Sequence, residues 1–462
     1  MKRPVILFIL ILIACISPNL MMHAQDIFPI TVNTEVGKLE FILGKDKDII
    51  TDLTLKGNIN GNDIATIRSM SKLSVLNMAD VNINAGGSFS SYGYTITTQN
   101  NILPSYMLCY LRNLTSLTVP KSITLISSRA FQGCTGLTAL EMPNGVNRID
   151  SEVFADCIGI KTITIPNSLT YLEEEAFKGC TGLTSVIIDN CSAEINTTAF
   201  INCTALKEYI VSESSDYYSS SEGVLYNKET SCLLAFPNAK STTYTIGDNI
   251  TSIGNSAFRN CTKLTSVNIG KNVTSIGGGA FSGCTELAYV TIPNSITSIG
   301  GDAFYRCSKL SSITIPKNVT SIGEYAFSRC TGLKEIHNNI LIPTNITSDF
   351  FSELTKSECK LYVPKGTSEA YSRALVWQDF GNIIEEVTTA ISDIKSSKVN
   401  VYSEQGSILV RCGKLGDNIY VYNLFGALLH SIKVTDDIVR INVSPQNLYL
   451  VKTGNKTYKV AL

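Results

Sequence analysis

The sequence predicts a solenoid of stacked β-coils followed by a small β-sandwich, and three observations support this prediction. Phenylalanines recur at every 23rd position through the middle of the chain, as at Phe258, Phe281 and Phe304. Cysteines follow most of them at a fixed offset of three residues. Residues 390 to 462 then change to short β-rich runs separated by turn residues, which is typical of a β-sandwich.

One repeat unit, LSSITIPKNVTSIGEYAFSRCTG, shows how a coil is built. Apolar residues alternate with serine and threonine over Leu310 to Ile315, which predicts a strand with one buried face. Pro316 lacks an N–H and would end the pairing. A second extended piece and a helical turn that buries Phe327 complete the coil. Since one coil cannot bury its apolar residues alone, the coils must stack on a shared core.

The cysteines are predicted to be reduced core residues rather than disulfides or metal ligands. The chain has 14 cysteines, and eight of them occupy one equivalent position per coil. Stacked neighbours would hold their Cβ atoms about 4.8 Å apart with parallel vectors, wider than the roughly 3.5–4.5 Å that a disulfide prefers. The ladder comprises Cys134, Cys157, Cys180, Cys203, Cys261, Cys284, Cys307 and Cys330. The other cysteines of the mature chain, such as Cys412, show no CxxC spacing.

The period breaks once, between Phe200 and Phe258, where the spacing is far longer than one repeat. The extra residues contain two β-rich runs around Asn227-Lys-Glu-Thr230. This pattern predicts a hairpin insert over about 212–245 that projects from the solenoid.

Residues 1–24 are predicted to be a signal peptide. Lys2 and Arg3 precede an apolar stretch, and Ala24 offers a small residue at the cleavage point, so that the mature chain would begin at Gln25. Two alternatives are a retained membrane anchor and lipidation at Cys15, because the preceding residues resemble a bacterial lipobox. No later segment has the 18 uninterrupted apolar residues that a transmembrane helix needs.

The regions that flank the repeats are predicted to cap the solenoid. Residues 25–110 contain degenerate repeats, with strands near Leu53 and over 73–78, and a short helix over 62–68 opened by an Asn or Asp cap. The repeats proper occupy 111–350. Residues 351–388 would form the C-terminal cap, with a strand over 359–366, a helix at Ala370 and Tyr371, and Trp377 as a packing residue. Residues 389–462 form the expected β-sandwich.

The recurring Ala-Phe-x-Gly-Cys-Thr block, over roughly residues 110 to 340, strongly resembles the BspA-like leucine-rich-repeat family. The resemblance implies a curved right-handed leucine-rich-repeat solenoid with its parallel sheet on the concave side. The C-terminal region resembles the sorting domains of type IX secretion, although Ser403-Glu-Gln stands where the usual Pro-Asn-Pro start is expected. A β-sandwich accessory domain is the alternative for this region.

Composition and motifs give no support for catalysis, a cofactor or a nucleic-acid partner. The net charge is −1 with 17% charged residues, so neither nucleic acid nor an anionic membrane is favoured. Of three histidines, only His337 and His430 lie outside the signal peptide. There is no HExxH, P-loop, GxSxG elbow or GxGxxG after a strand. The sequence therefore predicts that the protein is not an enzyme. The alternative, an enzyme, would require a catalytic role for His337.

Binding is expected on the outward positions of the strands and on the insert. The outward candidates are Lys161, Lys207, Glu208, Tyr289, Lys334, Glu335 and His337, and the insert candidates are Tyr217, Tyr218 and Tyr226. The family resemblance implies a secreted or cell-surface protein that mediates adhesion to, or recognition of, host extracellular-matrix or cell-surface proteins. A glycan-binding accessory protein of the bacterial envelope and a purely structural envelope component are the alternatives.

Overall fold

The computed structural model describes residues 29–386 except 229–231, and most of residues 400–461. In the second range, the short segments 405–406, 412–417, 424–427, 434–437, 444–447 and 454–455 are not described. The chain divides into two compact units, Met1–Glu386 and Val387–Leu462. The predicted signal peptide, its alternatives at Cys15, and Cys412 lie outside the described residues.

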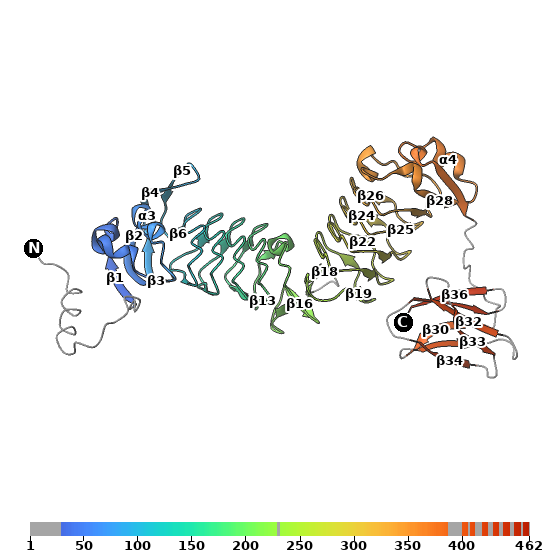
Figure 1. Cartoon of the computed structure of the whole chain (residues 1–462), viewed down its shortest axis with the longest axis horizontal. Coiled ribbons are helices and arrows are strands. Elements are labelled where there is room, and N and C mark those ends of the chain that lie inside the picture. Colours follow the sequence, from blue (N-terminus) through green and yellow to red (C-terminus); the bar gives the residue numbers. More distant parts are fainter. Residues whose placement is uncertain are drawn as a thin grey trace, which may run out of the picture. The chain divides into compact units, whose positions relative to one another are not determined.

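The N-terminal end of the first unit is a parallel sheet that leads into the repeats (Figure 1). Its strands are β1 (Ile30–Thr34), β2 (Asp52–Ile59), β3 (Val75–Ile83), β7 (Ser116–Thr118) and β9 (Ala139–Glu141). The helices of this region are α2 (Leu39–Leu43), η1 (Gly44–Asp48) and α3 (Gly61–Ser69). The predicted helix is confirmed as α3, and its cap is Asn60, whose side chain accepts from the Asn62 N–H while Asp63 accepts from the Asn60 N–H.

Each coil before the insert contributes two short strands. Each of these strands pairs in parallel with its equivalent in a neighbouring coil, so that the coils build two rows of strands (Figure 1). The longer row continues with β11 (Thr162–Ile165), β13 (Ser185–Ile188) and β15 (Glu208–Val211). The shorter row holds β6 (Ile102–Leu103), β8 (Leu125–Ile126), β10 (Arg148–Ile149), β12 (Tyr171–Leu172) and β14 (Glu194–Ile195). Each residue pairs with its equivalent in the next repeat, as Thr162 does with Ser185, so the predicted repeat and its parallel pairing are confirmed.

The coils after the insert repeat this arrangement. Their longer strands are β19 (Thr243–Thr245), β21 (Ser266–Asn268), β23 (Tyr289–Thr291), β25 (Ser312–Ile315) and β27 (Glu335–Asn338). Their shorter strands are β20 (Ser252–Ile253), β22 (Ser275–Ile276), β24 (Ser298–Ile299) and β26 (Ser321–Ile322). The segments that bury the phenylalanines are turns in most coils, and form one 3-10 turn in η2 (Thr197–Phe200) and another in η3 (Ser348–Phe351).

The phenylalanines form stacks of nearly parallel rings through the core. Phe281 lies 4.8 Å from Phe258 and 5.2 Å from Phe304 between ring centroids, and its side chain is fully buried. Phe236 of the insert, 4.9 Å from Phe258, extends this stack by one ring. Periodic burial of one aromatic per coil therefore provides a continuous core, as the sequence predicts.

The cysteine ladder is also confirmed: all eight thiols are buried and free. The structure adds a hydrogen bond in each coil, because each thiol donates to a carbonyl of the preceding coil. Cys307 Sγ lies 3.2 Å from the Phe281 carbonyl oxygen, and Cys330 Sγ lies 3.0 Å from that of Phe304. Burial raises the pKa of Cys134 and of Cys330 to about 12, so these thiols stay protonated and unreactive at neutral pH.

The insert contains the predicted hairpin, but the prediction that it projects from the solenoid is wrong. Its strands are β16 (Tyr218–Ser221), β17 (Val224–Asn227) and β18 (Cys232–Ala235), which pair antiparallel in that order. Strand β18 then pairs in parallel with β20, so that the insert extends the shorter row of the second block. Apolar residues such as Leu225 and Leu233 are fully buried and make this attachment favourable.

A second hairpin was not predicted. Strands β4 (Gly86–Ser91) and β5 (Tyr94–Thr98) pair antiparallel and are visible beside the first coils in Figure 1. The turn residues Tyr92 and Gly93 both have positive φ angles, of 51° and 80°, which suits a tight hairpin turn.

The C-terminal cap continues the parallel sheet instead of ending it. Its elements are η4 (Lys356–Glu358), β28 (Lys360–Pro364), α4 (Ser368–Arg373), η5 (Trp377–Asp379) and β29 (Asn382–Glu386), and the sheet order is β25-β27-β28-β29. Trp377 is fully buried, and its indole N–H donates to the Thr344 carbonyl at 2.9 Å. The predicted role of Trp377 as a packing residue of the cap is therefore confirmed.

The second unit consists of antiparallel sheets. One contains β30 (Asn400–Glu404), β31 (Ser407–Arg411) and β34 (Ile438–Asn442), and the other contains β32 (Asn418–Asn423), β33 (Leu428–Lys433), β35 (Leu448–Thr453) and β36 (Lys456–Ala461). Buried residues of both sheets, including Val410 and Val421, belong to one core cluster. The sequence predicts a small β-sandwich for this region, and the all-β character of that prediction is confirmed.

Candidate functional site

The outward face of the last parallel sheet gathers aromatic and charged side chains. On β27, Glu335 and His337 point away from the core, because the alternating Ile336 is fully buried. The register places Lys360 of β28 beside Glu335, and Tyr362 beside His337. Together with Glu386 at the end of β29, these five residues are called the His337 cluster below.

The aromatic rings of the His337 cluster are stacked face to face. The ring centroids of His337 and Tyr362 lie 4.5 Å apart with an interplanar angle of 5°. His337 Nδ1 lies 3.1 Å from a Glu386 carboxylate oxygen, and the Tyr362 hydroxyl donates to Glu335 at 3.4 Å. The carboxylates thus hold both rings in place from two strands, while the rings stay partly exposed.

Opposite charges balance within this face. Lys360 Nζ lies 3.3 Å from Glu335, and this hydrogen bond to the carboxylate raises the pKa of Lys360. Lys334, directly before β27, forms a further ion pair next to the cluster, with its Nζ 3.9 Å from a Glu358 carboxylate oxygen. Exposed pairs of this kind contribute little to stability, so their main effect is on the pattern of charge that a partner would meet.

The structure brings three of the sequence candidates, Lys334, Glu335 and His337, to this face. Tyr289 holds the outward position two repeats before Glu335 and is 55% exposed. The remaining candidates lie before the insert and are all exposed: Glu208 begins β15, and Lys161 and Lys207 directly precede β11 and β15. Glu208 lies against the insert, since a Cβ on Gly223 would meet the Glu208 Cβ at 2.7 Å.

The three tyrosines predicted on the insert have different surroundings. Tyr217 is 48% exposed. Tyr218 is buried, and its hydroxyl donates to the Ala193 carbonyl at 2.5 Å, so it anchors the insert and offers little surface to a partner. Tyr226 is half-buried and lines a cavity of about 440 Å³ with Tyr244.

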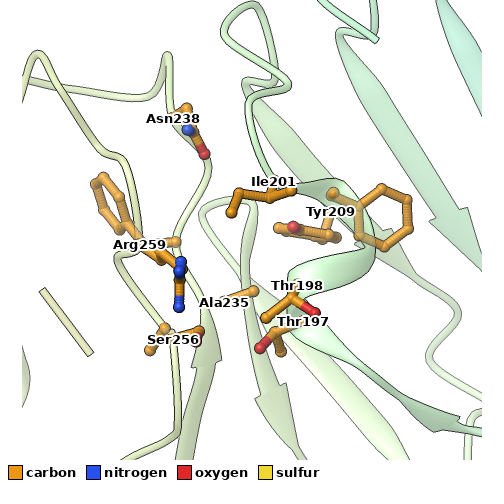
Figure 2. A pocket seen from close by; sticks show the side chains of 11 residues that line it. Thr197, Thr198, Ile201, Tyr209, Ala235, Asn238, Ser256 and Arg259 are labelled. Carbon is orange, nitrogen blue, oxygen red and sulfur yellow. The ribbon is translucent and has the colours of Figure 1, made fainter. Parts of the chain in front are cut away.

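A second cavity lies where the coils before and after the insert meet, and Figure 2 shows Thr197, Thr198 and Tyr209 facing Asn238, Ser256 and Arg259 across it. Its volume is about 20 Å³. A single water molecule needs roughly 10–15 Å³ of such space, so this cavity is too small for an organic ligand.

Sequence reasoning missed Lys360, Tyr362 and Glu386 as partners of His337. The strand that holds Lys360 and Tyr362 was predicted, and its alternation with the buried Leu361 and Val363 would have shown which residues face outward. The pairing of Tyr362 with His337 could not be predicted, because the two residues are separated by two positions more than the repeat length.

The His337 cluster is a partly exposed group of aromatic and charged side chains. The described contacts of His337 are with Glu335, Glu386 and Tyr362, and none of them is with a serine or cysteine nucleophile. Across the described residues, no group of three His, Cys, Asp or Glu side chains is placed to hold a metal ion. In the same part of the chain, no helix has the length and apolar character that crossing a membrane requires.

Stacked coils with parallel strands make the first unit a solenoid, a class of fold that offers extended surfaces to partners. The family of BspA type leucine-rich repeat regions matches residues 101–222 and 234–358 in six copies, together more than half of the chain. The protein therefore belongs to the BspA-type leucine-rich-repeat family.

Solved structures of leucine-rich-repeat proteins are similar to this chain. A leucine-rich-repeat protein from Eubacterium ventriosum is 20% identical, with 67% of this chain and 72% of that chain covered and a TM-score of 0.45. A leucine-rich cell-surface protein from Faecalibacterium prausnitzii is 22% identical, with 78% and 83% covered and a TM-score of 0.42. The pneumococcal vaccine antigen PcpA is 18% identical, with 79% and 91% covered and a TM-score of 0.47. No curated protein matches the chain.

Proposed function

We propose that this protein is an exported surface protein that recognises host extracellular-matrix or cell-surface proteins through the outward face of its solenoid. The observation that carries this proposal is the His337 cluster. Its stacked rings are held by carboxylates on a regular sheet, so little side-chain freedom would be lost on binding. Tyrosine is enriched among the residues that dominate binding energy at protein interfaces, and rim charges add specificity.

The family supports binding as the activity, since solenoids of this kind act typically as scaffolds for contacts. We propose that the protein is not an enzyme and needs no cofactor. We also propose that residues 1–24 direct export, and that the antiparallel unit is a β-sandwich that serves as a sorting domain.

The proposal is tested by surface plasmon resonance of residues 25–462 over immobilised fibronectin, laminin and collagen. The wild-type chain is expected to bind at least one of them. The double variant His337→Ala, Tyr362→Ala should bind about tenfold more weakly or worse, because the two stacked rings would be removed from the contact.

The matched control is Tyr171→Ala, which removes a tyrosine that is 56% exposed on β12 of the shorter row. This variant should bind like the wild type. The proposal would be abandoned if no matrix protein bound the folded chain, or if the double variant and the wild type bound equally well.

A further inference from the structure

The cavity of about 440 Å³ lies beside the insert, away from the His337 cluster. Its walls come from two segments: Ser219, Ser221 and Tyr226 belong to the insert strands, and Tyr244 and Asn249 belong to the first coil after it. A volume of this size falls within the range of roughly 300–1,000 Å³ that small-molecule sites occupy.

The cavity exists because the insert replaces part of the regular solenoid. Tyr244 pairs in register with Val267, which in turn pairs with Val290, and Val267 is a core residue. Tyr244 therefore occupies a core-facing position at the start of the second block. No regular coil precedes it there, so its side chain borders the open cavity beside the insert.

Aromatic packing fixes the Tyr244 side chain. Its ring centroid lies 4.7 Å from that of Phe236 and 6.1 Å from that of Phe258. Its hydroxyl lies 2.8 Å from the hydroxyl of Tyr226, so the two tyrosines meet across the junction between insert and repeat. The site is thus preorganised at the edge of a rigid aromatic stack.

The polar groups of the cavity suit a ligand that carries hydroxyl groups. The two phenols share a single hydrogen bond, and among the described contacts the second phenolic proton has no acceptor. Burial raises the pKa of both Tyr226 and Tyr244, so both remain protonated donors at neutral pH. Ser219, Ser221 and Asn249 add hydroxyl and amide groups that can both donate and accept.

The charge of the lining favours a neutral ligand. Glu222 and Lys228 are the charged residues among those that line the cavity, and their charges are opposite. Glu222 lies near enough to both phenols for its negative charge to raise their pKa. Its carboxylate can accept hydrogen bonds from ligand hydroxyls. Tyrosine rings offer an apolar face beside these groups, which complements the C–H face of a sugar ring.

We propose that this cavity binds a neutral mono- or disaccharide, with Tyr226 and Tyr244 as the central contacts. This site goes beyond the proposed recognition of proteins, because it uses a different surface and a different class of ligand. The phenols and Glu222 hydrogen-bond the sugar hydroxyls, and the serine and asparagine side chains complete the polar wall.

The test is ligand-observed saturation-transfer NMR on residues 25–462 with glucose, galactose, mannose, N-acetylglucosamine, lactose and cellobiose, each at millimolar concentration. At least one sugar should give a saturable signal. The double variant Tyr226→Phe, Tyr244→Phe keeps both rings and removes only the hydroxyls. It should weaken binding by about tenfold or abolish it, because hydrogen bonds in a partly desolvated site are lost.

The matched control is Tyr171→Phe, which removes the hydroxyl of an exposed tyrosine outside the cavity and should leave binding unchanged. Thermal melting of each variant checks its fold. If the tyrosine variant does not fold, Ser221→Ala with Asn249→Ala at the exposed wall replaces it and should weaken binding in the same way. The proposal fails if none of the six sugars binds, if binding survives in the folded variant, or if a control peptide such as Gly-Ser-Gly binds in their place. None of these outcomes depends on whether the His337 cluster recognises a matrix protein.

Discussion

Replacing Phe281 with alanine is expected to lower the free energy of unfolding by about 3–5 kcal/mol, as the loss of a fully buried aromatic side chain does. Phe281 stacks on Phe258 and Phe304, so its removal opens a gap between two coils. The neighbouring rings cannot close this gap easily, because each is held by the coil beyond it. Urea denaturation followed by circular dichroism measures the change.

The control for this substitution is Tyr289→Ala, eight residues later on the first strand of the next coil. Tyr289 is 55% exposed, so this change should cost far less than the loss of Phe281. Equal costs for the two variants would mean that the phenylalanine stack is not the core of the solenoid.

Substitution of Gly300 by alanine is expected to destabilise the protein by about 2–3 kcal/mol through overpacking. A Cβ at this position would lie 2.4 Å from the Gly278 backbone nitrogen of the preceding coil. Gly277 and Gly323 occupy the same position in the adjacent repeats, and a Cβ on Gly323 would lie 2.2 Å from the Gly301 nitrogen. In these coils of the second block, the backbones therefore approach each other too closely for a side chain at this position.

The neighbouring Gly278 provides the control for this prediction. The nearest atom to a Cβ on Gly278 would be the Gly301 carbonyl oxygen, at 3.5 Å, and its φ angle is not in the left-handed region. Gly278→Ala should therefore change the free energy of unfolding by no more than about 0.5 kcal/mol. Denaturation of the two variants under identical conditions measures the difference, and a Gly300→Ala variant as stable as Gly278→Ala would contradict the close approach of the coils.

The repeating part of the fold could be predicted because the same burial pattern recurs in each coil. A single Phe or Cys position has little meaning alone, but its recurrence once in every repeat requires one shared environment. The period also showed correctly that the ladder cysteines are not bridged.

The hairpins were harder to predict because their turns carry weak sequence signals. The turns Tyr92-Gly93 and Glu222-Gly223 both place two consecutive residues at positive φ, which asparagine or aspartate before glycine would have indicated more strongly. Hydrophobic residues of the insert showed that it is β-rich, but their partner strand could not be inferred. The pairing of β18 with β20 depends on contacts of the insert, which occur once in the chain and therefore leave no periodic pattern in the sequence.

The candidate site was only half predicted, for a related reason. His337 and Glu335 lie inside the repeat, where outward positions follow from alternation. Tyr362 and Glu386 lie in the cap, where the spacing departs from the period of the repeats. The period therefore does not predict which of their strand positions pair next to His337. Likewise, Tyr226 was selected as an interface tyrosine, but its contact with Tyr244 depends on how the insert meets the next coil.

Hydroxyl-radical footprinting of residues 25–462, free and saturated with the matrix protein that it binds, tests most directly that recognition takes place on the outward face. Labelling of His337, Tyr362 and Tyr289 is predicted to fall several-fold in the complex, while the exposed Tyr171 and Tyr217 keep their labelling. Protection of Tyr171 or Tyr217 with unchanged labelling at His337 and Tyr362 would contradict this account.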